Sequence, residues 1–160
     1  MKPRSLVLAA SFVSLLAFPL VATSGVREER RNLIGGELGG RGLLLTLNYE
    51  RFLSNEIGLG FGVMAIKTSG EGIVMLPLYV SVLPGDVHSP YLSAGATLLG
   101  GTGDFQNWQD TWLVHASLGY QYQSAGGFFV RPFFSYVRPT ERGSGDDYLL
   151  WPGLTIGGSF

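Results

Sequence analysis

A histidine and a serine two residues apart are the first side chains in this sequence whose types and spacing could do chemistry. His115 and Ser117 are separated only by Ala116. In a strand, residues two apart point to the same face, so the imidazole could act as a general base towards the serine hydroxyl. The chemistry that such a pair would serve is acyl transfer, and the next acid downstream is Glu141.

This pair resembles the His-x-Ser pair of outer-membrane lipid A deacylases, in which a Glu is the third member. The resemblance implies an esterase that acts on lipid A. Three features depart from that family. Leu118 stands where an Asn should follow the serine, and Glu141 falls in a predicted loop. Strand parity also places His115 and Ser117 in the lumen, where they do not face lipid. The alternative is a histidine whose hydrogen bonds are satisfied in the protein interior. We expect this alternative, and no enzymatic activity.

Five polar side chains, His115 among them, have the strand parity of an interior face: Glu37, Glu50, Tyr79, His115 and Arg131. Charges inside a narrow barrel must pair, so we predict an ion pair of Arg131 with either Glu50 or Glu37. A proton-transfer role for two carboxylates beside an arginine has little support in the sequence. We therefore interpret the five residues as a structural polar network that lines a lumen.

The sequence predicts neither a metal site nor a cofactor. It has no cysteine, and its two histidines, His88 and His115, lie far apart in the expected topology. No Gly-x-Gly stretch is a phosphate loop, because none is followed by a helix or by a suitably placed lysine. With 11 Lys plus Arg against 12 Asp plus Glu, the chain also lacks a basic surface for nucleic acid.

Strands are the elements that must position these residues. Glycine makes up 24 of 160 residues and recurs too often for stable helix interiors. Apolar residues alternate instead with small or polar ones, which is the period of a strand with two different surroundings. We predict eight strands, at residues 32–40, 42–53, 56–67, 72–84, 90–101, 110–123, 127–138 and 149–160. Whether residues 32–53 form one long strand with a bulge or two strands stays open.

The strand faces indicate what surrounds them. A soluble barrel would present many charges to water, whereas few charged residues occur within these strands. Short connections alternate with longer ones, as in barrels with periplasmic turns and external loops. Aromatic residues lie mostly near predicted strand ends, where an interfacial girdle belongs: Tyr49, Tyr91, Trp112, Tyr120, Tyr122, Tyr136, Tyr148 and Trp151. These patterns predict an all-β fold, a single antiparallel up-and-down transmembrane β-barrel of about eight strands.

The beginning of the chain has the order of a secretory signal peptide. A basic head precedes an apolar run over residues 6–22, and small residues follow it. The run is short for a spanning helix. We predict a signal peptide at residues 1–24 and one barrel domain at residues 25–160, located in the bacterial outer membrane.

The end of the chain carries a second targeting pattern, with alternating apolar residues and a final aromatic one. The residues of this pattern are Gly153, Leu154, Ile156 and Phe160. The segment 153–160 resembles the terminal strand signal of outer-membrane barrels, which the barrel-assembly machinery reads. Residues 47–63 are similar to early hairpins of small, largely uncharacterised outer-membrane β-barrel proteins. The resemblance covers most of residues 32–160 and implies outer-membrane lipid and the assembly machinery as partners.

A predicted loop over residues 101–110 holds Phe105 and Trp108. These rings could anchor a surface partner or pack over the barrel mouth. We expect a non-enzymatic outer-membrane barrel with a role in envelope integrity or in surface interaction through its loops, the partner being unspecified.

Two other functions stay open. A lipid-modifying enzyme, similar to the lipid A deacylases, requires accessible His115 and Ser117. A soluble periplasmic barrel that carries a small apolar ligand requires the large apolar faces to point inward, including Phe61, Val114 and Phe134. The direction of these three side chains separates the soluble carrier from the membrane barrel.

Overall fold

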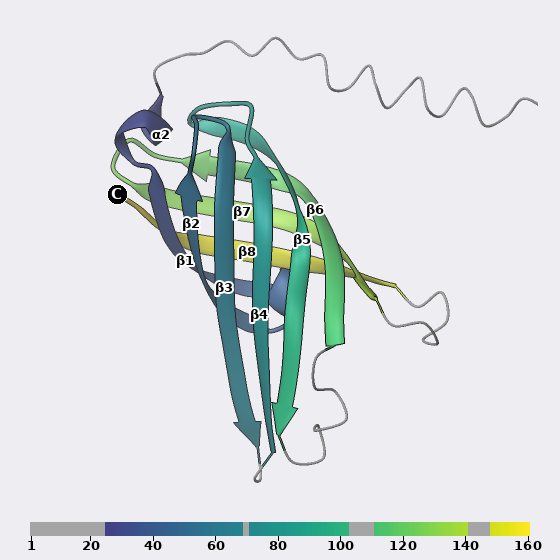
Figure 1. The fold of residues 1–160 in the computed structure, drawn as a ribbon. Helices are drawn as coiled ribbons and strands as arrows, with labels where there is room; N and C mark the ends of the chain where they lie inside the picture. The colour runs from purple at the N-terminus through teal and green to yellow at the C-terminus, as the bar shows by residue number, and fades with distance from the viewer. Residues whose placement is uncertain (1–24, 69–70, 103–110, 141–147) are drawn as a thin grey trace, which may run out of the picture.

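The computed structural model describes residues 25–68, 71–102, 111–140 and 148–160, which form one closed β-barrel (Figure 1). Its strands are β1 (Asn32–Gly39), β2 (Leu45–Phe52), β3 (Ile57–Thr68), β4 (Glu71–Val82), β5 (His88–Thr102), β6 (Thr111–Gln123), β7 (Phe128–Pro139) and β8 (Leu149–Ser159). Each strand pairs antiparallel with the next, and β8 pairs with β1. The prediction of an antiparallel up-and-down barrel of eight strands is confirmed, with every boundary within three residues of the expected one.

The open question over residues 32–53 has a clear answer. A short 3₁₀ turn, η1 (Gly40–Gly42), separates β1 from β2. Gly39 and Gly40 have φ values of 69° and 66°, which glycine adopts without steric cost. Leu43 follows with φ 64°, a left-handed conformation that costs a non-glycine residue about 1–2 kcal/mol. These angles turn the connection into the lumen, where Arg41 is fully buried.

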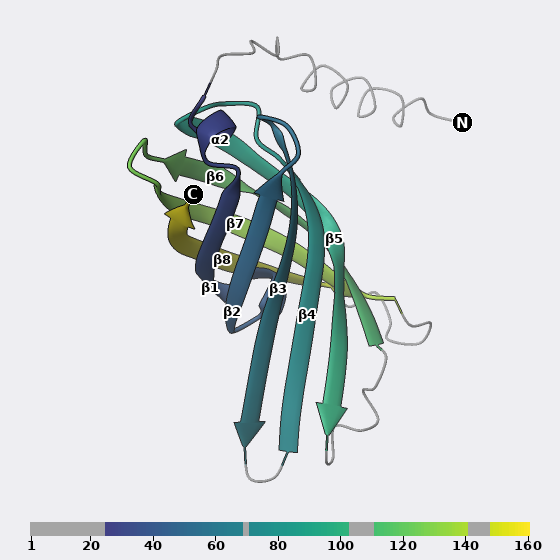
Figure 2. The same ribbon diagram turned by 60° about the vertical axis from the view of Figure 1, so that its left-hand side comes forward.

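The two ends of the barrel differ. The helix α2 (Val26–Glu29) lies across the end that holds the short connections β2–β3, β4–β5 and β6–β7, and we call this the α2 end (Figure 2). The chain also finishes there, since Asn32 and Phe160 exchange backbone hydrogen bonds of 3.0 and 2.9 Å. We call the opposite end the loop end. No helix in the described part of the chain is long and apolar enough to cross a membrane.

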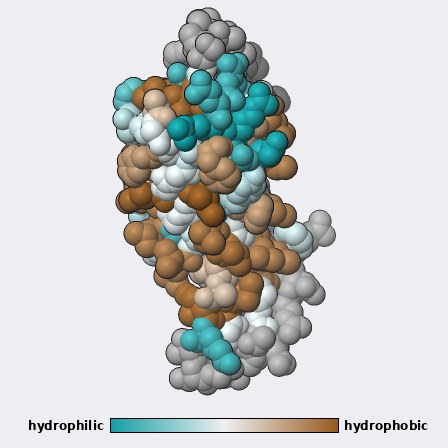
Figure 3. Space-filling view, turned by 90° about the vertical axis from the view of Figure 1, so that its left-hand side faces the viewer, coloured by the Kyte–Doolittle hydropathy of each residue, from teal (hydrophilic) through white to brown (hydrophobic). Residues whose placement is uncertain are grey.

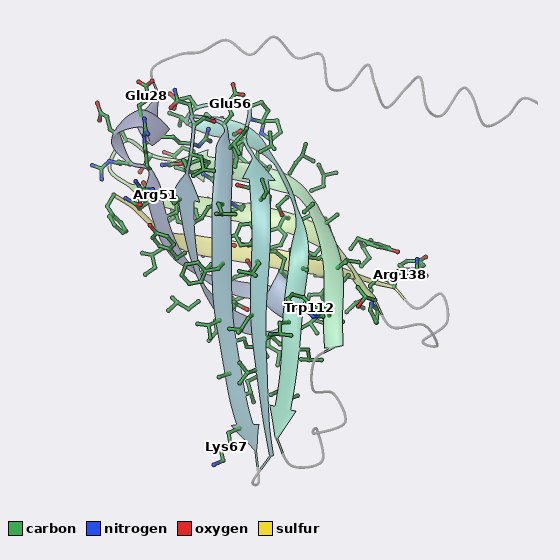
Figure 4. All side chains as sticks on the ribbon, in the orientation of Figure 1. Glu28, Arg51, Glu56, Lys67, Trp112 and Arg138 are labelled. Atoms are coloured by element: carbon green, nitrogen blue, oxygen red, sulfur yellow. The ribbon has the colours of Figure 1, made fainter. Side chains whose placement is uncertain are left out.

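An apolar belt surrounds the barrel. Outward side chains such as Phe61, Leu78 and Phe134 are 52%, 51% and 59% exposed. A hydrophobic band separates hydrophilic atoms at the two ends on the face drawn in Figure 3. Among the described outward strand positions, the Lys, Arg, Asp and Glu residues are Arg51 at the α2 end and Lys67 and Arg138 at the loop end (Figure 4).

The interior is arranged in three layers. An apolar cluster fills the α2 end: Leu33, Phe52, Leu83, Tyr91, Phe129 and Phe133. Charged and amide side chains occupy the middle, and a second apolar cluster lines the loop end: Met64, Met75, Leu99, Leu113 and Val137.

One expectation for the aromatic girdle is wrong. The aromatic pattern predicts that Tyr91 belongs to the outward girdle, but its side chain is fully buried. The reason is strand alternation, because its neighbours Pro90 and Leu92 point outward and Tyr91 therefore points inward. The alternation of residues along β5 predicts the direction of the Tyr91 side chain correctly, whereas its position near the end of the strand does not.

Candidate functional site

The structure places all five residues of the expected polar network in the lumen. Glu37, Glu50, Tyr79, His115 and Arg131 come from five different strands and are at most 3% exposed. Strand alternation directs each side chain inward, because its neighbours on either side occupy outward positions. The two carboxylates pair with different arginines.

The first ion pair joins Arg131 and Glu50. Arg131 Nη2 lies 2.7 Å from Glu50 Oε2, and Arg131 Nε donates a hydrogen bond of 2.7 Å to Gln121 Oε1. The other carboxylate oxygen of Glu50 accepts a hydrogen bond from Ser81, and the Tyr79 hydroxyl lies 3.4 Å from Oε2. Several partners therefore compensate the desolvation of this carboxylate.

The second ion pair joins Glu37 to Arg41, the residue at the tip of η1. The Arg41 backbone N–H donates a 3.0 Å hydrogen bond to Glu37 Oε1. Asn48 and Thr155 donate to Glu37 Oε2 over 3.0 and 3.3 Å. Arg41 Nη1 also donates to the Tyr91 hydroxyl over 3.0 Å. The inserted turn thus supplies the cation that a buried glutamate requires.

Aromatic rings surround the Arg41 guanidinium. Its central carbon lies 3.7 Å from the Tyr79 ring centroid and 5.3 Å from that of Phe133, within the range of cation–π contacts. Gly60 makes room for this arrangement, because a Cβ at that position would collide with the Tyr79 ring. The alternation of glycines on β3 is therefore what allows a large ring to lie across the narrow lumen.

Sequence reasoning missed Arg41 as a site residue and treated residues 39–42 only as a turn or bulge. The available signal was a lone arginine with glycine on both sides, at a connection between strands that otherwise contain few charges. That signal indicates a flexible turn but not the direction in which the turn points. Only the position of Glu37, four residues earlier, could have suggested an inward partner.

A third arginine closes the α2 end. Arg27 is 1% exposed and donates hydrogen bonds to the backbone oxygens of Asn55 and Leu83, both at 3.2 Å, and of Asp86 at 3.0 Å. Its guanidinium lies 5.2 Å from the Phe52 ring centroid. Burial lowers the pKa of Arg27 to about 10, against the opposing charge of Asp86. Arg27 therefore stays charged at neutral pH and joins two of the short turns.

The acyl-transfer pair has no catalytic geometry in the described structure. His115 and Ser117 are 3% and 5% exposed and both point into the lumen. The Ser117 hydroxyl lies 2.8 Å from that of Ser135, so its neighbour is another serine. Glu141 lies outside the described residues. Among the described residues, both side chains therefore face the lumen and not the apolar belt.

Phe105 and Trp108 lie outside the described residues. His88 is exposed and contacts the Tyr120 hydroxyl outside the barrel, whereas His115 points inward. Within the described part of the chain, no group of three or more His, Cys, Asp or Glu side chains could hold a metal ion.

The terminal pattern lies on β8 and at its end. Ile156 and Phe160 are 46% and 60% exposed and extend the apolar belt to the α2 end. Gly153 faces inward, where a Cβ would collide with the Phe133 ring. Leu154 pairs with Leu38 across the closing seam between β8 and β1.

The middle of the lumen is filled. The space between Glu50, Arg131 and Tyr79 has no room for a water molecule. An eight-stranded barrel encloses an interior about as wide as its own side chains, which agrees with this packing. The described part of the lumen therefore offers no continuous channel.

In comparisons with known proteins, no protein-family model and no curated sequence matches this chain.

Proposed function

We propose that this chain is a bacterial outer-membrane β-barrel with a sealed lumen, which acts without catalysis in envelope integrity or in surface interaction through its loops. The observation that carries the proposal is the inverted polarity of the barrel. Apolar side chains cover the outside, and two buried ion pairs occupy the middle of the interior. A globular protein in water has the opposite arrangement.

The size of the apolar belt supports a lipid environment. Soluble monomers rarely expose a continuous apolar patch of more than a few hundred Å², and this belt extends around all eight strands. The sheet also closes on itself where β1 pairs with β8, between Leu33–Ser159 and Gly39–Gly153, and lipid requires such closure because backbone groups there have no water to bind. Arg51, Lys67 and Arg138 lie where the belt ends, at the level of two interfaces.

The arrangement of the connections suggests the orientation. Outer-membrane barrels have short periplasmic turns and longer external loops. The α2 end carries the short turns and the final residue, Phe160, and would therefore face the periplasm. The loop end would face the cell exterior.

Both alternative functions have less support. A soluble carrier needs its large apolar side chains inside, but Phe61, Val114 and Phe134 lie on the outer surface. A lipid A deacylase needs a serine that reaches lipid, but Ser117 is buried beside Ser135. A filled lumen likewise argues against a pore.

Cell fractionation combined with gel mobility tests the proposal. We expect the full-length protein in the outer-membrane fraction, with a mobility that changes when the sample is boiled, because a folded barrel resists detergent until it is heated. Deleting Phe160 should abolish both results, since the chain loses its terminal aromatic residue and its backbone bonds to Asn32. Phe160→Tyr is the matched control and should assemble normally.

Recovery of the wild-type protein in the soluble periplasm, without any mobility change, would contradict the proposal. Normal assembly of the chain without Phe160 would leave the membrane location intact but would remove the role of its last residue.

A further inference from the structure

The wall of the barrel is much lower on one side. In Figure 2, β3, β4 and β5 continue well beyond the ends of β1 and β2 towards the loop end. The β2–β3 register ends at the pair Leu47 and Val63, and the β1–β8 register ends at Gly39 and Gly153. Residues 64–68 of β3 and 149–152 of β8 therefore border a gap in the wall, which we call the notch.

Behind the notch lies an apolar cavity of about 400 Å³. Its walls include Met64, Met75, Leu99, Leu113 and Val137, which we call the apolar cup. This volume is within the range of about 300–1,000 Å³ that is typical of ligand pockets. At about 30 Å³ each, on the order of ten water molecules would fill it, but these walls offer them almost no hydrogen-bond partners. The cup is thus suited to an apolar occupant.

The turn that seals the lumen also forms the floor of the notch. Leu43 adopts its left-handed conformation at this point and packs against the apolar cup. Trp151 crosses from β8 and donates a 3.1 Å hydrogen bond from its indole N–H to the Leu43 oxygen. A strained leucine held by a neighbouring strand indicates a built surface, since backbone strain concentrates where binding or switching requires it.

The notch opens sideways onto the apolar belt. Leu44 and Leu45, at its lower edge, are 54% and 62% exposed, and Leu150 on β8 is 62% exposed. A hydrocarbon chain could therefore pass from the surrounding bilayer into the cup without crossing a charged side chain in the described wall.

The height of the notch fits the outer interface of a membrane. β1 and β2 have eight residues each, fewer than the about 9–11 residues of a spanning strand. The unpaired strand edges beside the notch would be costly deep in lipid, so they belong near the headgroups. Lys67 lies on β3 beside the notch at the loop end (Figure 4), where its charge suits an anionic headgroup.

We propose that the apolar cup binds one hydrocarbon chain of an outer-leaflet membrane lipid, which enters through the notch. The proposal rests on the membrane location proposed above. It adds a ligand site to a barrel whose middle is filled by side chains. The short strands β1 and β2 would then provide the opening through which the lipid chain enters.

Photo-crosslinking in vesicles tests this site. The purified full-length protein is reconstituted in phosphatidylethanolamine and phosphatidylglycerol, with a small fraction of phosphatidylethanolamine that carries a diazirine at the end of one acyl chain. After illumination, peptide mass spectrometry maps the labelled residues. We expect label in the cup, on Met75 and Leu99, as well as on belt residues such as Leu78.

Two neighbouring residues of β4 provide a matched pair of variants. Met75→Trp fills the cup and should abolish its labelling while the belt stays labelled. Leu76→Trp adds the same ring on the outer face and should leave labelling of the cup unchanged. Leu99→Trp is a second filling variant, and the gel mobility shift on boiling checks that each variant is folded.

The outcomes separate the two proposals. A labelled belt with an unlabelled cup in the wild-type protein would overturn the lipid site, since water or another segment of the chain would then occupy the cup. A cup that stays labelled in folded Met75→Trp would do the same. A wild-type protein that neither shifts on boiling nor acquires label on its belt would overturn the membrane location itself.

Discussion

At the scale of single residues, the buried ion pair of Arg131 and Glu50 is expensive to form. Desolvation of two charges can exceed their mutual attraction, so such a pair stabilises a fold only when further hydrogen bonds support it. Here Ser81 and Gln121 each bind one member of the pair. Removing one member should therefore cost more free energy than the intact pair contributes, because the other charge would stay buried without a partner.

Arg131→Met should destabilise the barrel by about 3–5 kcal/mol, because it leaves the Glu50 carboxylate buried without its cation. The measurement is the free energy of unfolding in urea, followed by gel mobility in unboiled samples. The double variant Arg131→Met with Glu50→Gln removes both charges and should recover much of this loss. Unchanged stability of Arg131→Met would show that Glu50 does not depend on Arg131.

Parity within strands was sufficient to place the five lumen residues from sequence. It was not sufficient to choose between Glu50 and Glu37 as the partner of Arg131, because both share the inward face. That choice depends on the register of β1 and β2, and on the ion pair that Glu37 already forms with Arg41. Arg41 lies on the turn η1, and the alternation of residues along the strands does not predict the direction of that turn.

At the scale of elements, the turn η1 works as an internal plug. It brings Arg41 between two aromatic rings and fastens it to β1 through Glu37. Its own backbone also contributes, through the N–H of Arg41. A connection of this kind stabilises the barrel from inside instead of extending beyond it.

Arg41→Gln should lower the free energy of unfolding by about 3 kcal/mol or more, because Glu37 then loses its buried cation. Arg51→Gln is the matched control on β2, where an exposed arginine interacts with Asn32 over 3.3 Å. We expect the control to change stability by less than about 1 kcal/mol. Equal effects in urea unfolding of the two variants would contradict an internal role for η1.

The sequence predicted the strands well because each has a clear period of two, with belt residues on one face. It predicted the connections less well. The four-residue helix α2 has no apolar stripe to reveal it, and its main contact is the single side chain of Arg27 with turn carbonyls. The notch was likewise not predicted. It is present because β2 begins at Leu45, three residues after its predicted start at residue 42.

At the scale of the whole molecule, the belt makes a depth-dependent prediction. Leu78 pairs with Phe61, which lies midway along β3 between Glu56 and Lys67, whereas Val82 lies at the end of β4. Leu78→Lys should cost about 2–4 kcal/mol in a bilayer, and Val82→Lys about 0–1 kcal/mol. Unfolding of the two variants in lipid vesicles measures this difference. A soluble barrel would tolerate both changes equally, because water surrounds both positions.

The seam between β1 and β8 also governs how the barrel can form. Asn32 and Phe160 are 128 residues apart in the chain, yet they are bonded neighbours in the folded protein. The cylinder cannot close before β8 and Phe160 have been synthesised. Contacts of such long sequence separation are reached slowly, because the entropy of loop closure must be overcome first. Until then the chain has two open strand edges and an exposed apolar surface, both of which favour aggregation.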